Sequence, residues 1–167
     1  MNCAIYPGSF DPPTRGHLNL VERGLYIFDK VIVAVAQNSS KAALFTTAER
    51  LEMLRESLAE YSLDQVEVDS FEGLLVDYAR ERQAAAILRG LRATADFEYE
   101  FQMAMVNSHL EARIQSVFLM TDLHWLHVSS TIVKEAASYG ADVSAMVPPP
   151  VAERLKQKFL EKTSKDR

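Results

Sequence analysis

Short apolar runs alternate along the chain with longer stretches in which apolar residues recur at helical spacing. This pattern is typical of strand and helix units wound around a parallel sheet. It predicts an α/β fold, a doubly wound (Rossmann-like) parallel five-stranded sheet with flanking helices and a C-terminal helix. The predicted strands contain the runs Cys3–Tyr6, Val31–Ala36, Val66–Val68, Ala86–Leu88 and Val117–Met120.

The helical segments between these runs carry ordinary boundary signals. Leu18, Val21, Leu25 and Phe28 fall on one helical face, and the helix opened by Thr46 and Glu49 has the spacing of a capping box. Further helices are predicted over 95–110, with Phe97, Phe101 and Met105 aligned, and from Ser130 to Gly140. Pro148, Pro149 and Pro150 are interpreted as a stiff connector into a last helix, Val151–Leu160.

Length and composition narrow the class of protein. The chain has 167 residues, 48% of them hydrophobic, so it can bury one sizeable core. We expect a single domain over 1–167, with a catalytic core over about 1–147 and the C-terminal helix over about 151–162. The net charge of −5 argues against nucleic-acid and membrane-surface partners. With Cys3 as its single cysteine and no apolar stretch near 18 residues, the chain is expected in the cytoplasm.

Ligands of open parallel sheets bind beyond the carboxyl ends of the strands, so the loops there are the first candidates for chemistry. The passage from Tyr6 to His17 is rigid, with two glycines that permit close approach of a ligand, and it leads into a helix N-terminus. Such a layout suits a phosphate, although it matches neither common phosphate loop. A tight turn with a capping histidine is the simpler alternative.

Three further segments carry groups that suit phosphates. Lys41 lies in the loop 37–45, although a lone lysine is most often a solvated charge. Arg89 and Arg92 can hold phosphate bidentately, or they can pair with Asp96 or Glu98. The hydroxyls of residues 129–131 begin a helix, whose cap needs only one of them.

A resemblance to a known family decides between these alternatives. The motif Thr14-x-Gly16-His17 resembles that of the nucleotidyltransferase superfamily with a Thr/His-x-Gly-His signature. The segments 4–12, 87–92 with 96–100, and 125–134 are similar to bacterial phosphopantetheine adenylyltransferases. The resemblance covers about residues 3–150. It implies transfer of adenylate from ATP to 4′-phosphopantetheine, giving 3′-dephospho-coenzyme A and pyrophosphate, the penultimate step of coenzyme A biosynthesis.

The resemblance also implies roles for individual residues. The catalytic residues would be His17, Lys41 and Arg89. Phosphopantetheine would be bound by Ser9, Lys41, Leu75 and Arg89. ATP would be bound by Ser9, Phe10, His17, Gly90, Leu91, Arg92, Glu100, Trp125, Leu126, His127, Val128, Ser129, Ser130 and Thr131. Mg²⁺ would accompany ATP as the cofactor, and the assembly would be a homohexamer.

The sequence departs from the family pattern at Ser9, where the family usually has threonine; serine keeps the hydroxyl group. Two other functions also stay open. Another nucleotidyltransferase, for example one acting on nicotinate mononucleotide, would share most of these features. A non-catalytic nucleotide-binding module is the alternative of a different class. His124 and His127 lack nearby ligands at metal spacing, so no protein metal site is predicted.

Overall fold

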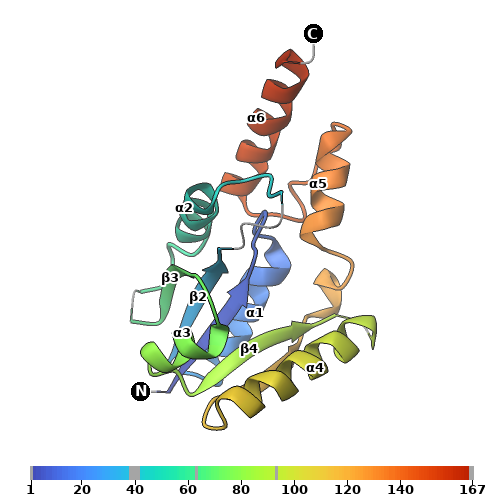
Figure 1. Cartoon of the computed structure of the whole chain (residues 1–167). Helices are drawn as coiled ribbons and strands as arrows, with labels where there is room; N and C mark the ends of the chain where they lie inside the picture. Colours follow the sequence, from blue (N-terminus) through green and yellow to red (C-terminus); the bar gives the residue numbers. More distant parts are fainter. Residues whose placement is uncertain (1, 38–41, 63, 93, 166–167) are drawn as a thin grey trace.

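The computed structural model describes residues 2–37, 42–62, 64–92 and 94–165. Strands and helices alternate, as the sequence predicts (Figure 1). The elements are β1 (Cys3–Gly8), α1 (Arg15–Leu25), β2 (Lys30–Ala36), α2 (Thr47–Ser57), β3 (Val66–Phe71), α3 (Leu75–Glu81), β4 (Ala86–Leu91), α4 (Thr94–Leu110), β5 (Gln115–Met120), the 3₁₀ turn η1 (Leu123–Trp125), α5 (Ser130–Ser138) and α6 (Pro149–Lys165).

The five strands form one parallel sheet in the order β3-β2-β1-β4-β5. The chain moves outward from β1 to β3, then returns to the other side of β1 with β4. This reversal between β1 and β4 is the switch point at which α/β sheets bind ligands. The predicted doubly wound α/β fold is confirmed.

Alternating residues of the strands supply two apolar layers. In β2, Val31 and Val33 belong to the layer packed with α1 and α2, whereas Ile32 belongs to the layer packed with α3. Every second side chain points to the same face of a strand, so a continuous apolar run serves both layers. In Figure 1, α3 and α4 lie on the opposite face of the sheet from α1.

A third apolar cluster joins α2, α5 and α6, with Phe45, Met53, Val133, Val151 and Leu155 buried in it. The predicted connector 148–150 is wrong in part, because α6 begins at Pro149. Proline fits a first helical turn, where its missing N–H has no intrahelical partner. The carbonyl of Pro148 accepts the first bonds, from the N–H groups of Val151 and Ala152, both at 3.0 Å.

The two sides of α4 have different surroundings. Phe97, Phe101 and Met105 are about half exposed, with the two phenyl rings stacked. The inner side of the helix instead faces a cavity, which Glu100, Met103, Ala104 and Asn107 help to line. The apolar stripe visible in the sequence therefore lies on the outer surface of the chain.

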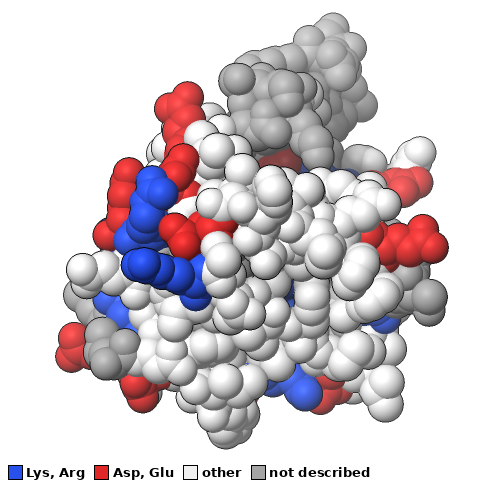
Figure 2. All heavy atoms as spheres, turned by 60° about the horizontal axis from the view of Figure 1, so that its bottom comes forward, with Lys and Arg blue, Asp and Glu red and all other residues white. Residues whose placement is uncertain are grey.

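Charges on the described surface are interspersed. On the face drawn in Figure 2, Lys and Arg lie beside Asp and Glu in mixed groups, and large uncharged areas lie between these groups. Ion pairs of this kind join Glu67 to Lys30 and to Arg82. Within the ranges that the structure describes, no helix is long and apolar enough to cross a membrane.

Candidate active site

Two adjoining cavities open at the carboxyl ends of β1 and β4, where the sheet reverses. The first has a volume of about 330 Å³ and lies beside His17 and the start of α5. The second, of about 530 Å³, extends between β1, β2 and α4. They share a wall made of Pro7, Gly8, Ser9, Arg89, Glu100, Ser130 and Thr131. Two ligands can therefore meet at this wall.

The loop after β1 is shaped by the packing of Phe10. Its ring is buried, edge-on to Tyr6 at 5.3 Å and to His17 at 5.0 Å between ring centroids. Phe10 has a φ of 47°, in the left-handed region. A Cβ at Gly8 would lie 2.9 Å from Cζ of the Phe10 ring, so glycine is required there. Ser9, between them, is thereby held on the shared wall.

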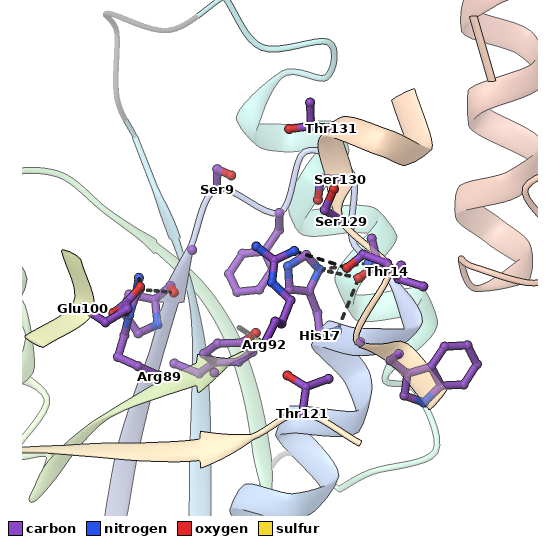
Figure 3. A pocket seen from close by; sticks show the side chains of 18 residues that line it. Ser9, Thr14, His17, Arg89, Arg92, Glu100, Thr121, Ser129, Ser130 and Thr131 are labelled. Carbon is purple, nitrogen blue, oxygen red and sulfur yellow. Dashed lines mark hydrogen bonds and ion pairs between the residues drawn. The ribbon is translucent and has the colours of Figure 1, made fainter. Parts of the chain in front are cut away.

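His17 is fixed by the start of its own helix. Thr14 is the N-cap of α1, and its side chain accepts from the backbone N–H of His17. In return, Nδ1 of His17 lies 2.9 Å from the backbone nitrogen of Thr14. This is a reciprocal capping box in which histidine replaces the usual Glu or Gln. Figure 3 shows the bonds between the two residues.

This contact determines the tautomer of His17. A backbone N–H can only donate, so Nδ1 must be the acceptor and the proton of the neutral ring is on Nε2. Burial, together with the nearby Arg92 cation, lowers the pKa of His17 from 6.5 to about 4. At neutral pH the ring is therefore an uncharged donor, and Nε2 is on the side away from Thr14 (Figure 3).

Arg89 and Glu100 form an ion pair across the shared wall. The Nε and Nη2 groups of Arg89 donate to the two carboxylate oxygens of Glu100, and Nη1 donates to the carbonyl of Pro7 at 3.0 Å. Burial alone would lower the pKa of Arg89, but the bonds to Glu100 raise it above its ordinary value. For Arg89 the alternative of a pair with Glu98 is wrong, since its partner is Glu100. The side chain of Asp96, the other carboxylate considered, lies outside the described part of the structure.

The hydroxyls at the start of α5 have separate partners. Ser129 is the N-cap and accepts from the N–H of Ile132, whereas the Ser130 hydroxyl donates to the carbonyl of Pro12 at 2.8 Å. Thr131 is exposed and lines both cavities. One hydroxyl thus suffices for the cap. The positive end of the α5 dipole faces the first cavity.

The second cavity has an apolar and a charged part. Phe71, Leu75, Met103 and Phe118 contribute to its apolar wall, and the buried Asn107 adds an amide. Asp11, at its charged end, accepts from Lys134 at 2.8 Å and from the N–H groups of Leu44 and Phe45. Burial would raise the pKa of Asp11, but these bonds hold it below its ordinary value.

Most of the residues singled out from the sequence line one of the cavities. The first is lined by Ser9, Phe10, His17, Arg89, Gly90, Arg92, Glu100, Trp125, Val128, Ser129, Ser130 and Thr131, and Leu75 lines the second. Leu91, Leu126 and His127 line neither. Lys41 lies outside the described residues. Sequence reasoning missed Arg50, Asn107 and Thr121, because a polar residue at the buried side of an element resembles a solvated one.

The comparisons with known proteins agree with this architecture. The family model for cytidylyltransferase-like proteins matches residues 5–136. A solved structure of a bifunctional NMN adenylyltransferase/ADP ribose pyrophosphatase from Francisella tularensis has a TM-score of 0.70 at 15% identity, covering 93% of this chain and 49% of that one. The chain is therefore a member of the cytidylyltransferase-like class, and its fold is one that this nucleotidyltransferase structure shares.

Curated relatives narrow the class to one family. A phosphopantetheine adenylyltransferase from Desulfosudis oleivorans is 56% identical over 159 residues, which cover 95% of this chain and 94% of the relative. Another, from Oleidesulfovibrio alaskensis, is 53% identical over 93% of this chain and 91% of its own length. The chain belongs to the phosphopantetheine adenylyltransferase family, as the resemblance in its sequence predicts.

Proposed function

We propose that the chain transfers the adenylyl group of ATP to 4′-phosphopantetheine, giving 3′-dephospho-coenzyme A and pyrophosphate. The observation that carries this proposal is the pair of cavities with one shared wall. A reaction that joins two phosphate-bearing substrates needs both of them held with their phosphates in contact. The identity of 56% to a phosphopantetheine adenylyltransferase, of which 94% is covered, supports the choice of acceptor.

The first cavity is assigned to ATP. His17, the positive end of α5 and Arg92 lie around it, and the Arg92 guanidinium is held by a bond to the carbonyl of Val128 at 3.2 Å. Donors of this kind suit a triphosphate. Figure 3 shows the side chains of Ser9, Ser130 and Arg92 around the same space as His17.

The second cavity is assigned to phosphopantetheine. An extended arm that bears amide groups needs an apolar channel with a few polar contacts, which Phe71, Leu75, Phe118 and Asn107 provide. Its phosphate would lie at the end shared with the ATP cavity, near Ser9 and Arg89. The lining thus fits a molecule that is anionic at one end only.

The chemistry of this transfer needs no general base. A phosphate monoester has a second pKa of about 6, so the acceptor is mostly a dianion at neutral pH. One of its oxygens attacks the α-phosphorus of ATP in line, and the bond from that phosphorus to the β-phosphate bridging oxygen breaks to release pyrophosphate. The chain then has to align the two anions and stabilise the developing charge.

His17 would supply one of the stabilising groups. As a neutral donor its Nε2–H can bond an oxygen of the α-phosphate without taking or losing a proton in the reaction. Arg89 would approach the acceptor phosphate from a fixed position, because its guanidinium is already oriented by Glu100 and Pro7. Lys41 would bridge the two phosphates, a role that rests on the family resemblance alone.

Mg²⁺ would enter as the ATP complex. The ion usually keeps several waters and is held mainly by substrate phosphates with few carboxylates. Among the residues that the structure describes, no group of three or more acidic, His or Cys side chains could hold a metal ion. When bound, the ion would shield the charge of the triphosphate.

The assembly is proposed to be a homohexamer in the cytoplasm. The exposed stripe Phe97, Phe101, Met105 and Val106 on α4 leaves an apolar surface of the kind that a partner subunit covers. The lone cysteine, Cys3, is buried as a free thiol, which suits a reducing compartment. Sedimentation of the purified protein tests the number of subunits directly.

The function is tested by pyrophosphate release from Mg-ATP with 4′-phosphopantetheine or nicotinate mononucleotide as the acceptor. We expect release with phosphopantetheine alone and a product with the mass of dephospho-coenzyme A. Turnover of nicotinate mononucleotide instead would overturn the acceptor assignment. Saturable ATP binding with no turnover of either acceptor would indicate a binding module.

A further inference from the structure

Arg50 is a basic residue buried beside the acceptor cavity. It lies in the first turn of α2, and only 6% of the residue is exposed. It also lines the second cavity, together with Ser9 and Arg89. A guanidinium is rarely buried without a charged partner, because removing it from water is costly. The surroundings of Arg50 therefore need an explanation.

Among the described residues, the Arg50 side chain donates hydrogen bonds to uncharged acceptors only. Nη1 donates to the carbonyl of Ser9 at 2.7 Å, Nε to the carbonyl of Thr46 at 3.3 Å and Nη2 to the hydroxyl of Thr47 at 3.0 Å. A guanidinium has five N–H donors. Two of them therefore have no acceptor among the residues that the structure describes.

The other charged residues of this cavity wall that the structure describes occur in pairs. Arg89 is paired with Glu100, and Lys134 is paired with Asp11 at 2.8 Å. Arg50 forms no ion pair with any carboxylate in the described ranges. The cavity wall thus holds one positive charge that the described part of the protein does not neutralise.

The position of Arg50 in α2 argues against a role in helix stability. A cation in the first turn of a helix opposes the macrodipole, which favours negative charge at that end. The hydrogen bond to Ser9 instead places the guanidinium against the wall that the two cavities share. The phosphate of an acceptor must come to this wall to attack the nucleotide.

We propose that Arg50 makes the acceptor cavity select a phosphorylated molecule over the same molecule with a free hydroxyl. This inference rests on the proposed function and adds the residue that supplies the phosphate preference. The substrate phosphate completes the charge balance of the wall. Because the guanidinium is buried, its attraction is little weakened by water or salt.

The test measures the dissociation constants of 4′-phosphopantetheine and of pantetheine, which lacks the phosphate, by calorimetry on the full chain. Arg50→Met keeps an unbranched apolar side chain close in length to the aliphatic part of arginine and removes the charged guanidinium. We expect the preference for the phosphorylated ligand to fall by at least about tenfold, the scale of a hydrogen bond to a charged group. Pantetheine affinity should change by less than about threefold, since its contacts are mainly apolar.

Matched variants separate charge from structure. Arg50→Lys should retain most of the preference, and Arg55→Met, which removes an exposed charge from the same helix, should leave it unchanged. If Arg50→Met does not fold, Arg50→Gln tests the same loss of charge and is expected to lower the preference in the same way. ATP affinity of each variant is measured as the control for an intact site.

Two results would overturn the proposal. If Arg50→Met weakened the binding of both ligands equally, the arginine would have a structural role only. If the preference for the phosphorylated ligand were unchanged, the arginine would have no role in recognition. Failure of the proposed function itself is distinguishable, because then the unmodified protein would neither bind nor adenylylate phosphopantetheine.

Discussion

The burial of His17 predicts how the stability of the protein depends on pH. In the folded chain the pKa of His17 is about 4, whereas an unperturbed histidine titrates near 6.5. Below pH 6.5 the unfolded chain therefore binds a proton that the folded chain does not. Stability is lost as the pH falls from 6.5 towards 4. Between pH 7.5 and pH 5 the loss from this one group is about 2 kcal/mol, at 1.36 kcal/mol per pH unit.

The assay is urea unfolding of the wild type and of His17→Gln at pH 7.5, 6.5 and 5, at one protein concentration. Glutamine does not titrate, so the difference between the two free energies of unfolding isolates the histidine. We expect the free energy of unfolding of the wild type, relative to that of His17→Gln, to be about 2 kcal/mol lower at pH 5 than at pH 7.5. A difference that does not change with pH would refute the lowered pKa of His17. A wild type that becomes more stable relative to the variant at pH 5 would mean that His17 is charged in the folded chain.

Three further predictions concern the same cleft. His17→Ala should lower kcat by about 10²-fold or more, the scale of one preorganised donor, and an unchanged kcat in a folded variant would remove His17 from catalysis. Thr14→Ala should lower the free energy of unfolding by about 1 kcal/mol through the lost cap, whereas Thr14→Ser should lose much less; equal losses in urea titrations would contradict the capping argument. Removal of Mg²⁺ with EDTA should stop pyrophosphate release without changing the circular dichroism spectrum, and turnover at full rate in EDTA would exclude the ion from the reaction.

The fold could be predicted from the sequence because its signals are local. Each strand is a short apolar run, and the capping residues Thr46 and Ser129 mark helix starts that the structure contains. The prediction of a connector over the proline run is wrong in part, since proline cannot continue a helix but can begin one. The aligned Phe97 and Phe101 were visible as a stripe, yet periodicity does not say whether the core or another molecule covers such a stripe.

The position of the site could also be predicted, because parallel strands bring their carboxyl ends to one edge of the sheet. The hydrogen-bond and ion-pair partners of the site residues could not be predicted from the sequence. Arg89 has several carboxylates within a few turns of α4, and only the packing of that helix selects Glu100. Similarly, Arg50 shares the helical spacing of the buried Met53 and Leu54, but its charge is typical of an exposed residue. Its burial becomes visible only when the loop after β1 packs against it.

The most direct test of the whole account is a crystal structure of the protein with 3′-dephospho-coenzyme A, the product that we expect to span both cavities. We expect the adenylate beside His17 and the start of α5, the pantetheine arm along Leu75 towards Asn107, and the linking phosphates at Ser9 and Arg89. A product bound with its adenylate in the cavity of Leu75, or outside the two cavities, would contradict the assignment of the substrates.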